Sequence, residues 1–206
     1  MQPDTFGAFP DFLQQPVEMV AEKLLGCILE RTIDGVCICV RIVETEAYDQ
    51  DDAASHTYHG QTTRNQVMFG LAGHLYVYFT YGMHYCANIV TGQAGYGSGV
   101  LIRAVEPIPG ESSRDGMAIL GKNRDGKTGT ILTNGPGKLT QALGIDFALR
   151  GHDLHGYPLR LRTGSLRPGE TVQTSPRIGI SKAKDAHRRY YIAGNPYVSG
   201  NKTLCL

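Results

Sequence analysis

The chain has 206 residues, of which 41% are hydrophobic, and a formal net charge of +1 at pH 7. This length and composition predict one domain with a sizeable buried core. No apolar run approaches the roughly eighteen residues of a membrane span, so no membrane partner is expected. The N-terminal stretch 1–15 has no basic segment followed by an apolar one, so we expect no secretory signal and an intracellular protein.

The first predicted element is an amphipathic helix over residues 17–25. Its apolar side chains recur at positions i, i+3, i+4, i+7 and i+8, while Pro16 suits a first helical turn and Gly26 a C-terminal stop. Residues 36–43 are nearly all apolar and rich in Val and Ile, which predicts a buried strand.

Two carboxylates lie at the end of this apolar strand. If the strand continues to Tyr48, its period of two places Glu44 and Glu46 on one face. Arg103 lies near the end of another apolar strand, predicted at 99–105, and could be their cationic partner. These residues form either a structural ion pair or a general base with its cation, and spacing alone does not say which carboxylate is the base.

The remainder of the chain predicts shorter elements. A strand is expected at 75–80, with weaker strands at 159–162 and 190–193. The segment 107–137 is rich in Gly, Ser and charge, which predicts a long loop. Its last residues lead through Lys138 into a short predicted helix, whose N-terminus is a plausible seat for a phosphate.

Tyrosine is over-represented, with eleven residues and no tryptophan. Tyr76 and Tyr78 share one face of the strand at 75–80, and Tyr81 precedes Gly82 at a predicted exposed turn. Tyrosines on strands commonly pack in the core or at an edge. The sharper interpretation is stacking on nucleobases, with Tyr81 entering a duplex as a wedge.

Charge is distributed unevenly along the chain. Residues 1–120 hold 6 Lys and Arg against 14 Asp and Glu, whereas residues 121–206 hold 14 against 5. Five basic residues gather in one short segment: Arg177, Lys182, Lys184, Arg188 and Arg189. They predict either a solvated basic face or a surface that binds phosphate.

Two groups of residues have side chains that could bind a metal. Cys37 and Cys39 alternate with apolar residues, and buried thiols are the simpler interpretation because a C-x-C pair lacks further ligands. The five cysteines predict no disulfide framework. The second group lies in one predicted loop and is more typical of a polar surface than of a metal site: Asp51, Asp52, His56 and His59.

Several ordered motifs cover about residues 12–199. They are Ala-Glu-Lys-Leu-Leu-Gly at 21–26, Glu-Thr-Glu-Ala-Tyr at 44–48, Arg-Asn-x-x-Met-Phe at 64–69, Tyr-Val-Tyr-x-x-Tyr-Gly-Met at 76–83, Val-Leu-Ile-Arg-Ala-x-Glu-Pro at 100–107, Asn-Gly-Pro-Gly-Lys-Leu at 134–139, Gln-Ala-Leu at 141–143 and Ser-Pro-Arg-Ile-Gly at 175–179. In this order the motifs resemble those of the alkyladenine (3-methyladenine) DNA glycosylase family.

The resemblance implies a role for each matched residue. Glu46 is implied as the general base that activates water, with Arg103 beside it. The pocket for the flipped base is implied to consist of Tyr48, His56, Tyr78 and Asn88. Tyr81 is implied as the wedge that fills the gap left in the DNA. The expected contacts with the DNA backbone are Arg64, Lys138, Arg177, Lys182 and Lys184.

The resemblance also implies a fold and an activity. The expected fold is a single α+β domain over residues 1–206, with a curved antiparallel sheet flanked by helices, similar to the C-terminal domain of formyltransferases. The expected enzyme is a monofunctional, monomeric DNA glycosylase that uses no cofactor or metal and leaves an abasic site in duplex DNA containing damaged purines. The implied substrates are 3-methyladenine, hypoxanthine and ethenoadenine, and the implied location is the cytoplasm and nucleoid of a bacterium or the nucleus of a eukaryote.

Two other functions are compatible with the same residues. One is a metal-dependent nuclease, built on Glu44, Glu46, Asp51, Asp52 and His56. The other is a lesion-binding protein that keeps the pocket but does not cleave the glycosidic bond. Strand breaks that depend on metal would identify the first, and tight lesion binding without base release would identify the second.

Overall fold

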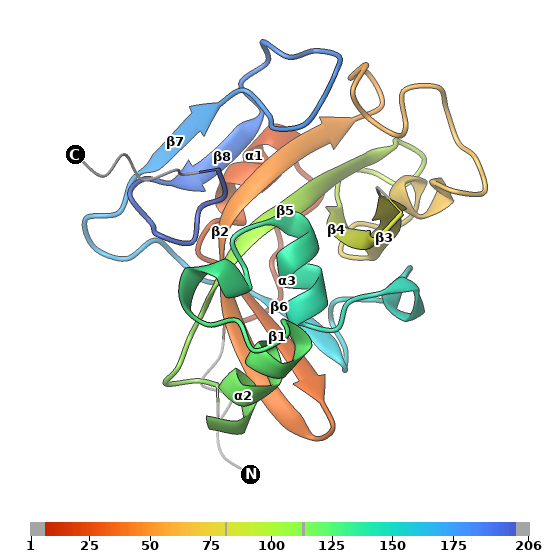
Figure 1. Cartoon of the computed structure of the whole chain (residues 1–206). Coiled ribbons are helices and arrows are strands. Elements are labelled where there is room, and N and C mark those ends of the chain that lie inside the picture. The colour runs from red at the N-terminus through yellow and green to blue at the C-terminus, as the bar shows by residue number, and fades with distance from the viewer. Residues whose placement is uncertain (1–6, 81, 113, 201–206) are drawn as a thin grey trace.

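The computed structural model describes residues 7–80, 82–112 and 114–200. These residues form an eight-stranded antiparallel sheet and three α-helices (Figure 1). The strands are β1 (Ile28–Ile33), β2 (Val36–Asp49), β3 (Leu75–Thr80), β4 (His84–Val90), β5 (Ser98–Pro107), β6 (Leu159–Arg162), β7 (Val172–Ser175) and β8 (Arg189–Ile192). The helices are α1 (Val17–Lys23), α2 (Arg114–Asn123) and α3 (Pro136–Ala142).

β2 is the central strand of the sheet. The order β3-β4-β5-β2-β1-β6 forms the main path, and β8 pairs with β2 and with β7. The register of β2 against β5 shifts twice, between Ile42 and Glu44 and between Glu44 and Thr45. Such irregularities bend a strand and increase its twist. They lie where the carboxylates of β2 begin.

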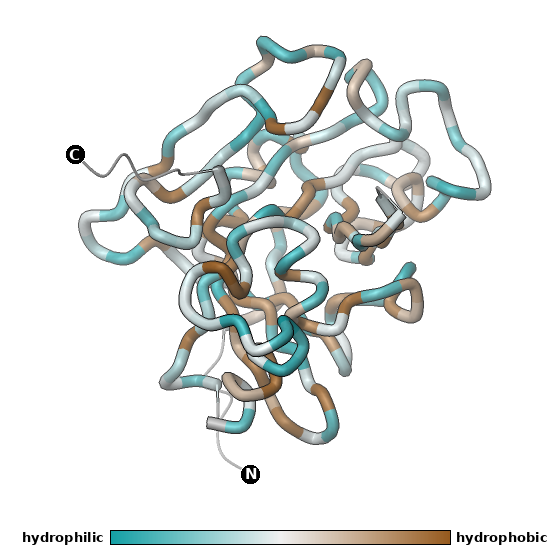
Figure 2. The backbone as a smooth tube through the Cα atoms, in the orientation of Figure 1, coloured by the Kyte–Doolittle hydropathy of each residue, from teal (hydrophilic) through white to brown (hydrophobic). Residues whose placement is uncertain are grey.

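Both faces of β2 are covered, and its residues 38–47 are all buried. Helix α1 packs against β2, β5 and β8, while α3 packs against β4 and β5. Apolar residues are therefore concentrated along the strands, and the outer loops are largely hydrophilic (Figure 2). A strand covered on both faces has a nearly continuous apolar sequence, which is the pattern that predicted it.

Most of the predicted elements are confirmed, as is the α+β class with its curved antiparallel sheet. The helix at 17–25 corresponds to α1, and the strands correspond to β2, β3, β5, β6 and β8. β1, β4 and β7 were not predicted. None of the described helices has both the length and the apolar run needed to span a bilayer.

The prediction of a long loop over 107–137 is wrong, because α2 lies within it. Gly116 and Gly121 lower the intrinsic helix propensity of this segment. Packing on β2 compensates, since a Cβ built on Gly116 would lie only 3.2 Å from the carbonyl oxygen of Cys37. Close tertiary contact therefore overrides the local preference of this segment.

A second close approach of backbones gives a test of the fold. A Cβ on Gly164 would overlap the carbonyl oxygen of Gly26, so the backbone would have to move. We expect Gly164→Ala to lower the free energy of unfolding by about 1–3 kcal/mol. Gly110→Ala is the control, because nothing lies within 4 Å of that position. Equal stability of the two variants in urea titrations would contradict this expectation.

Candidate active site

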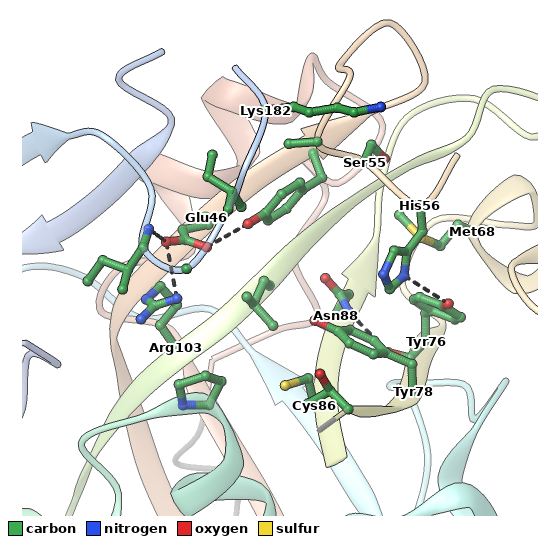
Figure 3. Close-up of a pocket in the computed structure, with 18 of the residues that line it drawn as sticks. Glu46, Ser55, His56, Met68, Tyr76, Tyr78, Cys86, Asn88, Arg103 and Lys182 are labelled. Atoms are coloured by element: carbon green, nitrogen blue, oxygen red, sulfur yellow. Dashed lines mark hydrogen bonds and ion pairs between the residues drawn. The ribbon is translucent and has the colours of Figure 1, made fainter. Parts of the chain in front are cut away.

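A cavity of about 400 Å³ opens where β2, β3, β4 and β5 lie side by side (Figure 3). This volume is within the range of small-molecule sites. Loop residues 53–56 and 178–182 complete its walls. Figure 3 shows Glu46 and Arg103 on one side of the cavity and the aromatic side chains of His56, Tyr76 and Tyr78 on the other.

The register of the sheet sets this arrangement. Tyr76 on β3 pairs with Asn88 on β4, Asn88 pairs with Leu101 on β5, and Leu101 pairs with Glu46 on β2. Residues paired in this way point to the same face of a sheet. Asn88 and Leu101 therefore lie between an aromatic side and an acidic side, although the four residues are far apart in the sequence.

The Glu46 carboxylate is fully buried and held by two hydrogen bonds and one ion pair. Its Oε1 accepts a hydrogen bond from the backbone N–H of Ile178 at 2.8 Å and lies 3.1 Å from Nη1 of Arg103. Its Oε2 accepts a hydrogen bond from the Tyr48 hydroxyl at 2.7 Å. Burial, and then the neighbouring Glu46, raise the pKa of Tyr48, so this hydroxyl stays protonated and donates. The orientation of Glu46 is thereby restrained at both oxygens.

Glu44 has a different environment, although it lies only two residues away and is also fully buried. Its Oε1 accepts hydrogen bonds from Nε of Arg103 at 2.8 Å and from Nε of Arg189 at 2.6 Å. Ser199 donates its hydroxyl to Oε1 and its backbone N–H to Oε2. Glu44 does not line the cavity, whereas Glu46 does. The structure thus distinguishes two carboxylates that spacing alone left equivalent.

Arg103 connects these two carboxylates. Its side chain is 7% exposed, with Nε on Glu44 and Nη1 on Glu46. Burial alone would disfavour its charge, but Glu46 and Glu44 raise the pKa of Arg103 above its ordinary value. The guanidinium therefore stays charged. Because it is paired with both carboxylates, the position of Glu46 depends on that of Glu44.

The aromatic side consists of side chains in contact with one another. Tyr76 and Tyr78 stack with ring centroids 5.7 Å apart, and the His56 ring lies edge-on to Tyr78 at 4.6 Å. Nδ1 of His56 is 3.2 Å from the Tyr76 hydroxyl. Tyr48 belongs to β2, and strands β4 and β5 separate it from Tyr78 on β3. Tyr48, His56 and Tyr78 nevertheless line the same cavity.

A pocket with aromatic sides and one restrained carboxylate agrees with the family that the motifs suggested. The family model described as methylpurine-DNA glycosylase (MPG) matches residues 11–196. The chain belongs to this family. It is therefore a DNA glycosylase for methylated purines.

Similar proteins carry the name "Putative 3-methyladenine DNA glycosylase". The one from Carboxydothermus hydrogenoformans is 48% identical over 189 residues, covering 91% of this chain and 96% of its own. The one from Methanoculleus marisnigri is 45% identical over 192 residues, with coverage of 91% and 96%. The one from Corynebacterium glutamicum is 45% identical over 200 residues, with coverage of 95% and 89%.

The basic residues expected to contact DNA lie in different environments in this glycosylase. Arg64, Lys182 and Lys184 are exposed, and Lys182 also lines the cavity. Lys138 is partly buried and donates to Oδ1 of Asn134 at 2.7 Å. Tyr81, the expected wedge, lies outside the described residues. The DNA contacts of these residues stay predictions.

Arg177 does not fit its expected role as a backbone contact. Its side chain is 0% exposed and forms an ion pair with Asp52, which is 2% exposed. Arg188 and Arg189 of the same basic segment are also engaged internally, with Asp49 and Glu44 respectively. The segment is therefore not a continuous basic surface, because these acidic side chains neutralise its arginines.

The acidic loop after β2 does not assemble the metal ligands considered for residues 51–59. Asp52 is bound by Arg177, and the Tyr96 hydroxyl donates to Oδ2 of Asp51 at 2.7 Å. Each of these carboxylates thus has a partner from another part of the chain.

One group of described residues has ligand atoms close enough to share a metal, namely Glu30, Cys37 and Cys39, within 4.8 Å of one another. Burial, and then the adjacent Cys37, raise the pKa of Cys39 to about 12, which favours its neutral thiol. Glu30 is paired with Arg162 at 2.6 Å. These residues are better described as a packed polar cluster on β1 and β2, and we assign no metal to them.

Sequence reasoning missed several residues of the cavity. Tyr76 could have been included, because it shares a face with Tyr78 on a predicted strand. Leu101, Cys86 and Ile178 had no such signal. Their place depends on strand pairing and on a loop that returns to the site from far along the chain.

The environment of Glu44 predicts a structural role. Glu44→Gln keeps the shape of the side chain but removes the charge shared by two buried arginines. We expect it to lower the free energy of unfolding by about 3–5 kcal/mol, the usual cost of breaking a buried ion pair. The control is Glu111→Gln, since Glu111 is exposed. Denaturant unfolding near pH 7 that finds both variants as stable as the wild type would refute this role.

Proposed function

We propose that this glycosylase flips a damaged purine out of duplex DNA into the cavity and hydrolyses its N-glycosidic bond, with Glu46 as general base. The observation that carries the proposal is the buried Glu46 carboxylate facing the cavity opposite the aromatic side. By analogy with the names of its relatives, 3-methyladenine is the first substrate to consider. Hypoxanthine and ethenoadenine are further proposed substrates.

The contacts of Glu46 suit a general base. An ionised carboxylate offers about four acceptor sites. Hydrogen bonds from Tyr48 and Ile178 occupy two of them, and the ion pair with Arg103 lies at a third. The remaining site can accept the proton of a water molecule that attacks the anomeric carbon of the sugar. Arg103 is paired with the carboxylate and lines the same cavity. The purine leaves with the electrons of the glycosidic bond.

The aromatic rings favour the bases that leave most easily. Methylation at a ring nitrogen makes a purine cationic, and the faces of Tyr48 and Tyr78 attract a cation more strongly than a neutral ring. Asn88, on the row between the two sides of the cavity, is proposed to crowd the amino group of guanine. A neutral lesion such as hypoxanthine would require protonation on leaving.

DNA is the proposed macromolecular partner, bound by a monomer in duplex form. Lys182 at the rim of the cavity, together with Lys184 and Arg64, supports contact with phosphates, because these three side chains are exposed. Tyr81 is proposed as the wedge. Gly82 and Met83, which follow Tyr81 in the sequence, are exposed.

Single-turnover base release tests the role of Glu46. Wild type and Glu46→Gln are mixed with methylated duplex DNA and with a duplex containing one hypoxanthine, both with EDTA present. We expect the variant to release base about 10²- to 10⁴-fold more slowly, as expected when a general base is removed, while its affinity for damaged duplex is retained.

The products distinguish the alternatives. Folded wild type that binds lesions but releases no base would support a lesion-binding protein. Strand breaks that require added metal would support a nuclease. Glu46→Gln with full activity would remove Glu46 as the base.

The exposed lysines predict how binding depends on salt. The double variant Lys182→Ala/Lys184→Ala should reduce the slope of log K against log salt by about 0.9 for each phosphate that the variant no longer neutralises. Lys127→Ala is the control, because Lys127 is exposed near the end of α2, away from the cavity. Fluorescence titrations at several salt concentrations measure both. Equal slopes for the double variant and the wild type would exclude phosphate binding by these lysines.

A further inference from the structure

Arg177 is a buried cation in contact with the ring of Tyr48. Its Cζ lies 4.5 Å from the centroid of that ring. Tyr48 lines the cavity, whereas Arg177 does not. The guanidinium therefore covers one face of the ring, and only the other face is left for a base.

The same guanidinium joins the two loop segments that complete the cavity. Its Nη1 and Nη2 both donate to the carboxylate of Asp52, and Nη1 also donates to the carbonyl oxygen of Ala47 at 2.9 Å. Asp52 precedes the wall residues 53–56, and Arg177 precedes the wall residues 178–182. Because Ile178 donates its N–H to Glu46, displacement of Arg177 would disturb the carboxylate as well.

Asp52 balances the charge of Arg177. Burial opposes ionisation of Asp52, but hydrogen bonds from Arg177 hold the pKa of this carboxyl below its ordinary value. Nη1 of Arg188 lies 3.5 Å from the same carboxylate. The outer face of Tyr48 therefore contacts a cation whose charge is partly compensated, in a region with little water to screen it.

We propose that Arg177 is a positioning residue that sets how strongly the pocket discriminates between cationic and neutral bases, by stacking on the outer face of Tyr48 under the control of Asp52. The inference rests on the proposed role of Tyr48 in binding the flipped base. A cation on one face of an aromatic ring draws its π-electrons towards that face and weakens attraction to a second cation on the other. Arg177 thus moderates the preference for charged lesions, and Asp52 limits this effect.

The test compares two lesions of the same shape that differ in charge. One duplex carries 7-methyladenine on a 2′-fluoro sugar, where the fluorine disfavours the cationic sugar formed on cleavage and so keeps the base attached. The other carries neutral 7-deaza-7-methyladenine on the same 2′-fluoro sugar. The readout is the ratio of the dissociation constants of the two duplexes, measured by fluorescence anisotropy for each variant of the full chain.

The substitutions on the two sides of the ion pair should act in opposite directions. Arg177→Met removes the cation from the outer face of Tyr48 and should raise the preference for the cationic lesion by roughly three- to tenfold. Asp52→Asn leaves Arg177 uncompensated and should lower that preference. Arg177→Lys keeps a cation at the ring and should stay close to the wild type. Circular dichroism checks that each variant is folded.

A purely structural role gives a different result. If Arg177 only holds the walls together, Arg177→Met and Asp52→Asn weaken both duplexes alike, and the ratio does not change. That result overturns the inference but leaves the proposed function intact. Wild type that binds neither lesion better than undamaged duplex overturns the proposed pocket, and the inference with it. If Arg177→Met does not fold, the ratio of dissociation constants is compared between Asp52→Asn and Arg177→Lys. A lower preference for the cationic lesion in Asp52→Asn supports the inference, and equal ratios overturn it.

Discussion

The pairing of buried carboxylates with arginines from distant segments holds both the fold and the candidate active site. Glu44 accepts hydrogen bonds from Arg103 and Arg189, and Arg103 extends from Glu44 to Glu46. Charges removed from water are costly unless every partner is present. β2, β5, β8 and the distant residue Ser199 must therefore be in place before Glu46 has its geometry. The position of the proposed catalytic carboxylate therefore depends on the completed tertiary structure.

The same principle explains why the acidic first part and the basic second part of the sequence do not form two separate surfaces of opposite charge. Acidic residues of the first part of the chain pair with arginines of the second. The pairs are Arg189 with Glu44, Arg177 with Asp52, and Arg188 with Asp49. Lys182 and Lys184 stay exposed, because the segment that carries them passes the rim of the cavity. Within one basic segment, the arginines thus form internal ion pairs, and Lys182 and Lys184 are exposed to solvent.

The local sequence pattern predicted secondary structure correctly where burial of apolar side chains was the dominant force. The apolar run of β2, the tyrosine-rich β3 and the spacing of α1 each reflect burial of apolar side chains, so their period could be read directly. α2 could not be predicted, because Gly116 and Gly121 lower its helix propensity, and the close approach of Gly116 to β2 is a tertiary contact. β1 and β4 have polar residues mixed with apolar ones, and neither shows a clean alternation.

The sequence by itself determined the family, the main strands and the choice of Glu46, Arg103 and the aromatic residues as candidates, because motifs and periodicity are local properties of a chain. Only the tertiary structure decided which carboxylate faces the cavity, that Tyr76 and Leu101 belong to it, and that Arg177 lies behind Tyr48 instead of at an exposed surface. Register and ion pairing settle these points, since both depend on which distant segments meet and on the cost of leaving a buried charge without a partner.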